Sequence, residues 1–199
     1  MKQITHTLLL SFVLMGCAAQ GNDVHYLSPS RGDQPNVLIL GEDNDKDTVR
    51  RNTRVFKRVL AALSTELQNE GFAVYDEVGL TLGHSNQGRS RRTDAEIIDI
   101  ARSVKKIPID VAVIFSIYYS TEKSSYAWKL RTRIEGRLLA VHSSRQLGNF
   151  EVELPHADNV PTNSSHDHLI ETVGKNAKRL AHDLGAVLAQ KLAHASPSK

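Results

Sequence analysis

The stretch DVAVIFSIYY, residues 110–119, is a nearly continuous apolar run in the middle of the chain. Apolar side chains occupy both of its alternating faces, and β-branched and aromatic residues are frequent in it. This pattern is typical of a strand that is buried on both sides of a sheet. We therefore predict a central strand here, with other elements covering both of its faces.

The residues before this run alternate between strand and helix patterns. Val37–Leu40 is a short apolar run that predicts a buried first strand, and Asn52–Gln68 carries apolar residues at helical spacing. Phe72–Val78 has the alternation of a second strand. Thr93 and Glu96 form a capping-box pattern that predicts the start of a second helix, Ala95–Lys105.

The residues after it predict two further strands and a long helix. Trp128–Ala140 alternates most regularly, and Asn149–Leu154 follows it as a hairpin partner. Leu169–Leu192 has the apolar spacing of one terminal helix. The predicted order is β-α-β-α-β-β-β-α, which indicates a single α/β domain with a mixed sheet and helices packed on it.

Cys17 is the only cysteine among 199 residues, and it follows an apolar run, Leu8–Met15. The run is less than half of the roughly 20 residues that span a bilayer, so it favours a cleaved signal peptide over a membrane helix. The residues Leu14–Cys17, LMGC, resemble the lipobox of bacterial lipoproteins. This resemblance implies that the peptide is cut before Cys17 and that its thiol carries a diacylglycerol.

The resemblance also implies a location in the cell. Lipoproteins without Asp directly after the cysteine usually reach the outer membrane, and here that residue is Ala18. We expect residues 1–16 to be the signal peptide, 17–35 a lipidated cysteine with a flexible tether, 36–194 a periplasmic domain and 195–199 a tail. As a flexible coil the tether averages about 23 Å, and fully extended it reaches roughly 60 Å.

The charged residues suggest one candidate partner-binding surface. One face of the strand Trp128–Ala140 is basic, and the loop before the second helix carries a further basic run. Charges on an exposed strand also prevent unwanted pairing, which is the alternative explanation. The candidate residues are Lys129, Arg131, Arg133, Arg137, Arg89, Arg91 and Arg92. We expect them to meet an acidic partner, an anionic glycan or a neighbouring subunit, whose acidic Glu42–Asp47 stretch could meet them head to tail.

Other motifs do not support a cofactor, metal or catalytic site. The spacing of Asp43, Asp45 and Asp47 starts like a calcium loop, but the glycine and glutamate that such a loop needs are missing, so we expect these residues to stabilise the start of the next helix. His166 and His168 are two apart, which is poor zinc-ligand spacing on a helix. Neither a nucleophile elbow nor a phosphate-binding glycine loop occurs.

The element order resembles a family of envelope domains that includes the N-terminal domain of TolB, the curli secretion protein CsgG and the penicillin-binding-protein activator LpoB. The resemblance rests on the strand Asn36–Gly41, the two helices, the strand Val111–Phe115 and a glycine-containing hairpin. It implies assembly or partner binding without chemistry, and a net charge of +3 gives no reason to expect nucleic acid.

These observations predict a non-enzymatic, lipid-anchored subunit of an envelope machine, such as a secretion, polysaccharide-export or flagellar ring apparatus. Two alternatives stay open. The chain could activate a peptidoglycan synthase, although its tether is short for reaching an inner-membrane enzyme. It could also be a subunit of a CsgG-like export channel, which would need additional amphipathic strands of about 10 residues.

Overall fold

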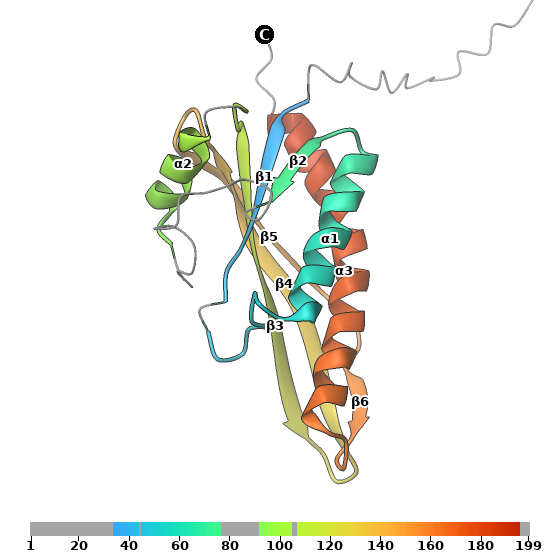
Figure 1. Cartoon of the computed structure of the whole chain (residues 1–199). Helices are drawn as coiled ribbons and strands as arrows, with labels where there is room; N and C mark the ends of the chain where they lie inside the picture. The colour runs from blue at the N-terminus through green and yellow to red at the C-terminus, as the bar shows by residue number, and fades with distance from the viewer. Residues whose placement is uncertain (1–33, 44, 77–91, 105–106, 196–199) are drawn as a thin grey trace, which may run out of the picture.

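The computed structural model describes residues 34–43, 45–76, 92–104 and 107–195. In this part of the chain, six strands and three helices follow one another in a mixed α/β order. Their bounds are β1 Asn36–Gly41, α1 Arg54–Asn69, β2 Ala73–Asp76, α2 Asp94–Ser103, β3 Val111–Lys123, β4 Ala127–Ala140, β5 Arg145–Glu153, β6 Asp158–Pro161 and α3 His166–Ala195. The predicted fold class is confirmed (Figure 1).

One twisted sheet organises the fold, with strand order β2-β1-β3-β4-β5. Strand β1 pairs in parallel with both β2 and β3, while β4 pairs antiparallel with β3 along almost its whole length. Strands β5 and β6 share the other edge of β4, where β5 pairs with its second half and β6 with Ala127–Leu130. The sheet therefore changes from parallel to antiparallel between β3 and β4.

Two hydrophobic cores lie on opposite faces of this sheet. The larger core fills the space between the sheet and helices α1 and α3, and includes Phe115 and Ile117 of β3. The smaller core lies under α2 and includes Ala112 and Ile114. A helix of ten residues is about 15 Å long, whereas the thirteen residues of β3 extend about 43 Å. Strand β3 is buried on both faces from Val111 to Ile117, which confirms a central covered strand over most of residues 110–119, and its second half extends beyond α2.

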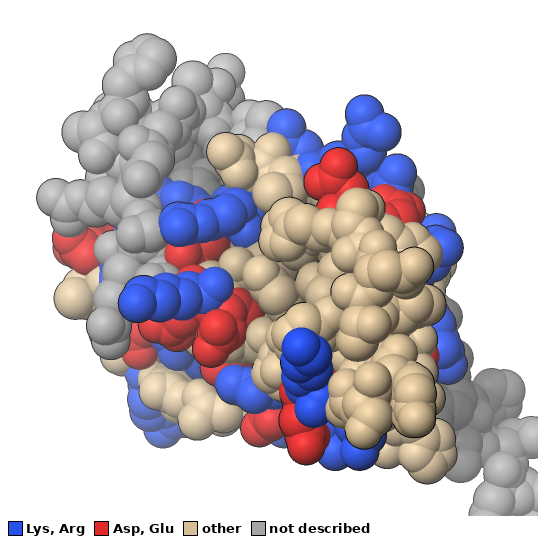
Figure 2. Space-filling view, turned by 90° about the horizontal axis from the view of Figure 1, so that it is seen from below, with Lys and Arg blue, Asp and Glu red and all other residues tan. Residues whose placement is uncertain are grey.

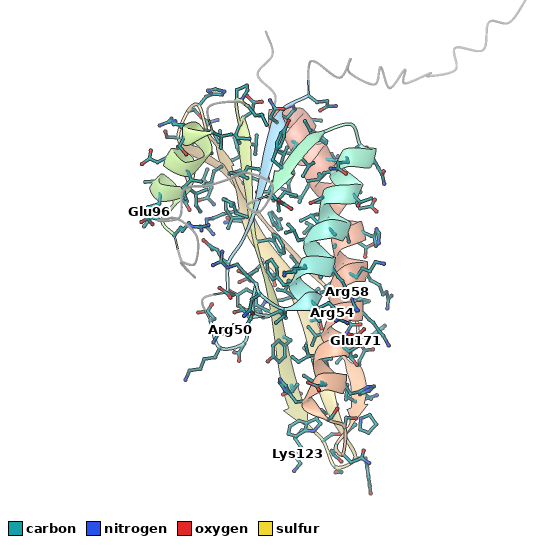
Figure 3. All side chains as sticks on the ribbon, in the orientation of Figure 1. Arg50, Arg54, Arg58, Glu96, Lys123 and Glu171 are labelled. Atoms are coloured by element: carbon teal, nitrogen blue, oxygen red, sulfur yellow. The ribbon has the colours of Figure 1, made fainter. Side chains whose placement is uncertain are left out.

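Helices α1 and α3 pack side by side on one face of the sheet (Figure 1). Gly185 permits their close approach, because a Cβ atom there would lie 2.3 Å from Cβ of Glu66. Arg58 of α1 and Glu171 of α3 form an ion pair at 2.9 Å across the same junction (Figure 3). None of the helices in the described ranges has both the length and the apolar character that crossing a bilayer requires.

Local sequence signals set the start of both shorter helices. Thr93 accepts a hydrogen bond from the backbone N–H of Glu96, and the Glu96 side chain accepts one from the backbone of Thr93, so the predicted capping box is confirmed. Thr53 caps α1 through the backbone N–H of Phe56. The first turn of α1 contains no acidic residue, and Asp43 accepts a hydrogen bond from the backbone N–H of Arg51, two residues before the N-cap. Stabilisation of the helix start by Asp43, Asp45 and Asp47 stays a prediction.

Two strand predictions need correction. The segment Asp158–Pro161, for which the sequence predicts no strand, forms strand β6 against the start of β4. Strand β5 begins at Arg145, four residues before the predicted start, and a register shift follows within its pairing with β4. The observed order therefore contains one more strand than the predicted order.

Candidate docking face

Helix α2 leaves a large part of one sheet face without a covering helix in the described part of the chain. We call this surface the open face. Strand alternation and the pairing registers place alternate residues of β3, β4 and β5 on it. It consists of Ser116, Tyr118, Ser120 and Glu122 of β3, Lys129, Arg131, Arg133, Glu135 and Arg137 of β4, and Asn149, Glu151 and Glu153 of β5.

The open face carries four basic and four acidic side chains, counted from these three strands. Arg131 forms an ion pair with Glu153 at 3.3 Å, and Arg133 lies 3.4 Å from a carboxylate oxygen of Glu135. The Arg133 guanidinium also lies over the Tyr118 ring, 4.6 Å from its centre. Figure 2 shows basic and acidic side chains next to one another on the side of the molecule that it draws. The surface is therefore of mixed charge, although its basic residues all come from β4.

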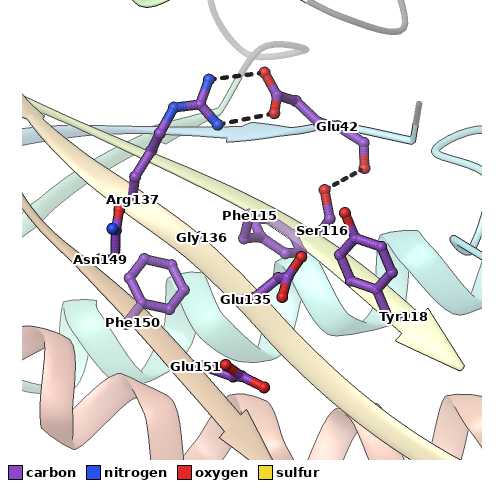
Figure 4. A pocket seen from close by; sticks show the side chains of 10 residues that line it. All are labelled: Glu42, Phe115, Ser116, Tyr118, Glu135, Gly136, Arg137, Asn149, Phe150 and Glu151. Atoms are coloured by element: carbon purple, nitrogen blue, oxygen red, sulfur yellow. Dashed lines mark hydrogen bonds and ion pairs between the residues drawn. The ribbon is translucent and has the colours of Figure 1, made fainter. Parts of the chain in front are cut away.

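A pocket of about 450 Å³ opens on this face. Its lining includes Ser116 and Tyr118 from β3, Glu135 and Arg137 from β4, and Glu42 from the end of β1 (Figure 4). A second depression of about 680 Å³ shares part of this lining and extends to the start of α2. Both lie at the carboxyl ends of the parallel strands, where the connections leave toward opposite sheet faces. Open α/β sheets bind ligands at this kind of position.

Arg137 joins three elements at the rim of the pocket. Its guanidinium donates two hydrogen bonds to the carboxylate of Glu42, at 2.9 and 3.1 Å, and a third to Asp94 of α2 at 2.7 Å. The hydrogen bonds to Glu42 are the main cause that raises the pKa of Arg137 above its ordinary value, and Asp94 adds to this effect while burial opposes it. Glu42 itself is only 8% exposed. The three residues thus tie β1, β4 and α2 together.

Tyr118 is the next polar group along β3. Its hydroxyl donates a hydrogen bond to Asp45 at 3.0 Å. Burial is the first cause that raises the pKa of the Tyr118 phenol above its usual value, and hydrogen bonds to Asp45 and Glu135 add to it. The phenol therefore stays protonated at physiological pH and serves as a donor.

The acidic stretch after β1 has partners within the same chain. Besides Glu42, Asp43 accepts hydrogen bonds from the backbone and side chain of Arg51, and Asp45 accepts one from Tyr118. The backbone of the stretch also follows β3, with Tyr119 N–H donating to the Asp47 carbonyl at 2.9 Å. The expected contact of this stretch with the basic face of a neighbouring subunit stays a prediction.

The sequence candidates separate into three groups in the structure. Lys129, Arg131 and Arg133 lie together on the open face, as their alternation predicts, and Arg137 lies at its covered end. Arg92 is buried beside the second depression, with 6% of its surface exposed. Arg89, Arg91 and Cys17 lie outside the described residues. Within those residues, no group of three or more histidine, cysteine or acidic side chains is arranged to hold a metal ion.

Sequence reasoning missed the partners of the basic residues. Glu42 lies 95 positions from Arg137, and Tyr118 meets Arg133 only because β3 pairs with β4. The sequence of β3 does not show which of its residues lie on the open face, because the first half of the strand is apolar on both faces. Only the change from Phe115 to Ser116 and then to Tyr118 marks the point where α2 stops covering the strand.

Comparison with known proteins shows similarity only at the level of structure. Neither a family model nor a curated sequence matches the chain. Among solved structures, the hypothetical protein CT253 from Chlamydia trachomatis has a TM-score of 0.52 and 9% identity, covering 81% of this chain and 99% of that chain. The two proteins share a fold. At this identity the match shows nothing beyond the fold.

Two further matches have TM-scores below 0.5. The lipoprotein GNA1162 from Neisseria meningitidis has a TM-score of 0.45 and 14% identity, covering 78% of this chain and 96% of that chain. TolB from Acinetobacter baumannii has a TM-score of 0.36 and 12% identity, covering 81% of this chain but 29% of that chain. The specific resemblance to TolB, CsgG and LpoB therefore stays a prediction.

Proposed function

We propose that this chain is a non-enzymatic, lipid-anchored docking subunit of the bacterial cell envelope. In this proposal Cys17 carries the lipid, residues 17–35 form the tether, and the α/β domain presents its open face to a partner protein in the periplasm. The outer membrane is the proposed site of the anchor, because Ala18 follows the cysteine. Secretion, polysaccharide-export and flagellar ring machines are the candidate assemblies.

The observation that carries the proposal is the open face itself. A sheet face is usually covered by another layer, because its apolar side chains must be buried. Here the uncovered part is polar. An ion pair with Glu153 of the neighbouring strand β5 holds Arg131 in place, and one with Glu135 of its own strand β4 holds Arg133. Side chains that are already ordered lose less entropy when a partner binds. The face is therefore suited to binding a partner while remaining stable in water.

The arrangement of polar groups in the pocket supports binding over catalysis. The Ser116 hydroxyl donates to the backbone carbonyl of Glu42 at 3.0 Å, and the Tyr118 hydroxyl donates to Asp45. Activating either hydroxyl as a nucleophile would require a free base at hydrogen-bond distance. The Ser116 hydroxyl points instead to a backbone carbonyl, which is not a base, and Arg137 is held by Glu42 and Asp94.

The charges of the open face favour a partner of mixed charge. Basic and acidic residues are present in equal number, so a uniformly anionic polymer would meet repulsion from Glu122, Glu151 and Glu153. A protein surface, or a second copy of this chain, can place opposite charges against both signs. We therefore favour a protein partner over an anionic glycan.

Reversing two charges on the open face tests this proposal. We expect Arg131→Glu with Arg133→Glu to reduce the amount of co-purified envelope partner at least tenfold, because like charges would then face the partner's acidic groups. The measurement is quantitative co-purification of the full, anchored chain from detergent extracts of its own cells. Lys175→Glu with Lys178→Glu, on exposed positions of α3, changes net charge equally and should keep the partner. Equal recovery with both double variants would refute a docking role for the open face.

Removing the thiol of Cys17 tests the anchor. We expect Cys17→Ser to move the protein from the membrane fraction into the soluble periplasmic fraction, because two or three acyl chains hold a protein on a bilayer almost permanently. The measurement is membrane fractionation together with the intact mass of the mature chain. Ala19→Ser serves as the control and should stay with the membrane. An unmodified wild-type mass, or membrane retention of Cys17→Ser, would contradict lipid attachment at this residue.

A further inference from the structure

The turn between β3 and β4 exposes an aromatic side chain at one end of the molecule. Tyr126 is 90% exposed, more than any other large hydrophobic residue in the described part of the chain. Its turn, Ser124–Ala127, lies beside the connection Thr162–Ser165, because Ala127 pairs with Pro161. We call these two segments the tip. Figure 1 places the tip at the opposite end of the elongated body from the start of β1.

The tip is a rigid structure. The backbone N–H and the hydroxyl of Ser124 both donate to the Ala127 carbonyl at 2.8 Å, and the Ala127 N–H bonds back to the Ser124 hydroxyl. Strand β6 pairs with the part of β4 that directly follows the turn. Trp128 packs partly into the larger core, and the Lys123 ammonium lies 5.8 Å from the centre of its ring. Tyr126 therefore points outward from a turn that is fixed by the paired strands β3 and β4.

The geometry of the turn does not require tyrosine. Turn positions that need a positive φ favour glycine or asparagine, and neither Ser125 nor Tyr126 has a positive φ. Side-chain burial does not require it either, since almost the whole residue faces solvent. A serine or an aspartate would satisfy the backbone at lower cost in exposed apolar area. The residue thus contributes nothing to the fold that a small polar residue would not supply.

The chemistry around Tyr126 fits a protein partner. Neither of the two segments contains a charged residue, and hydroxyl and amide groups dominate, as in Ser125, Thr162 and Asn163. Figure 2 shows a broad area of residues other than Lys, Arg, Asp and Glu on this side of the molecule, with charged side chains around it. Tyrosine surrounded by serine and asparagine is the composition of protein-binding loops, because the aromatic ring gives a large contact area at low entropic cost and the small polar groups adapt their hydrogen bonds. Tyrosine is also enriched among residues that dominate binding energy.

We propose that the tip is a second docking element, which inserts Tyr126 into a concave, uncharged site of a partner protein. The inference rests on the proposed anchor in one respect. The tether begins at the end of the body where β1 starts, and β3 extends about 43 Å from there toward the tip. The tip is therefore the end of the body farthest from the point where the tether attaches. This position favours a protein over the anchoring lipid surface as the occupant.

Site-specific photocrosslinking tests the proposal in the full, anchored chain. Benzoylphenylalanine replaces Tyr126 in one variant and Lys178 of α3 in the control, and the adducts are identified by mass spectrometry. We expect an adduct of one discrete mass with one identified protein at position 126, and none at position 178. Labelling of lipid or glycan at position 126, or the same products at both positions, would overturn the proposal.

Affinity measurements with the identified protein then decide whether Tyr126 provides the contact. We expect Tyr126→Ala to weaken binding of the purified partner at least tenfold and Tyr126→Phe to weaken it less than threefold, with unfolding midpoints unchanged. Equal affinity of Tyr126→Ala and the wild type would refute the proposal. Repeating the crosslink in Cys17→Ser separates the two hypotheses. An adduct that persists in the released protein supports the tip even if the anchor is absent, whereas loss of the adduct only on release identifies membrane attachment as the requirement.

Discussion

Replacing Gly136 with alanine is expected to lower the free energy of unfolding by about 3 kcal/mol, the upper end of the usual cost of overpacking. A Cβ atom at this position would lie 2.0 Å from the backbone oxygen of Ile114 and 2.5 Å from the ring of Phe150. Gly136 is in β4, and pairs with Phe115 on one side and Phe150 on the other. Neither neighbour can move freely, because β3 is buried and β5 is fixed by its own pairing. Denaturant unfolding of the α/β domain measures the effect.

Gly71→Ala separates this steric effect from a general cost of replacing glycine. Gly71 follows α1 with a φ of 92°, and no atom lies within 4 Å of its hypothetical Cβ. Alanine at this position lowers the free energy of unfolding only through the left-handed backbone conformation, by about 1 kcal/mol. We therefore expect Gly136→Ala to be clearly more destabilising than Gly71→Ala. The reverse order would mean that the sheet relaxes around residue 136 and that the packing between β3, β4 and β5 is looser than described.

Elements with a local signal could be predicted from the sequence. The alternation of β4 identified which side chains face the larger core, and Thr93 with Glu96 identified the start of α2. Both signals depend on residues a few positions apart, whose relative placement is set by the period of a strand or by the geometry of a helix end. The long apolar period of α3 is of the same kind. These features are therefore accessible without knowledge of the tertiary structure.

Strand β6 shows why other elements could not be predicted. Four residues are too few to display an alternation, and Val160 is the only buried apolar residue among them. The strand exists because Ala127–Leu130 offers an unpaired edge beyond the end of β5. That edge depends on the lengths of two other strands, which the segment 158–161 does not encode.

The candidate docking face was predictable in part. Alternation correctly grouped Lys129, Arg131 and Arg133 on one face, but it could not reveal Glu153 on the neighbouring strand or the mixed charge that results. It also grouped Arg137 with these residues, although Arg137 lies at the end of the face that α2 covers. Position along the strand, in addition to the face, therefore decides whether a basic residue is available to a partner or is used within the fold.

Arg137→Ala is accordingly expected to destabilise the domain by about 3 kcal/mol, the lower end of the cost of breaking a buried ion pair. The substitution leaves the carboxylate of Glu42, which is 8% exposed, without its cation, and releases Asp94 at the start of α2. Arg137→Lys keeps the charge but cannot form the two parallel hydrogen bonds to Glu42, so we expect a smaller loss. Denaturant unfolding monitored by circular dichroism provides the free energies.

Arg131→Ala is the matched control, because Arg131 lies on the same strand and the same face but its side chain is 59% exposed. Exposed ion pairs such as the one with Glu153 contribute at most about 1 kcal/mol, so this variant should remain close to the wild type in stability. A double-mutant cycle with Glu42→Gln adds a direct test, since two residues in one hydrogen-bonded network should show a coupling energy of about 1 to 3 kcal/mol. Additive effects of Glu42→Gln and Arg137→Ala would contradict the contact between them. Equal losses for Arg137→Ala and Arg131→Ala would place Arg137 with the solvent-exposed residues of the open face and remove its role in joining β1, β4 and α2.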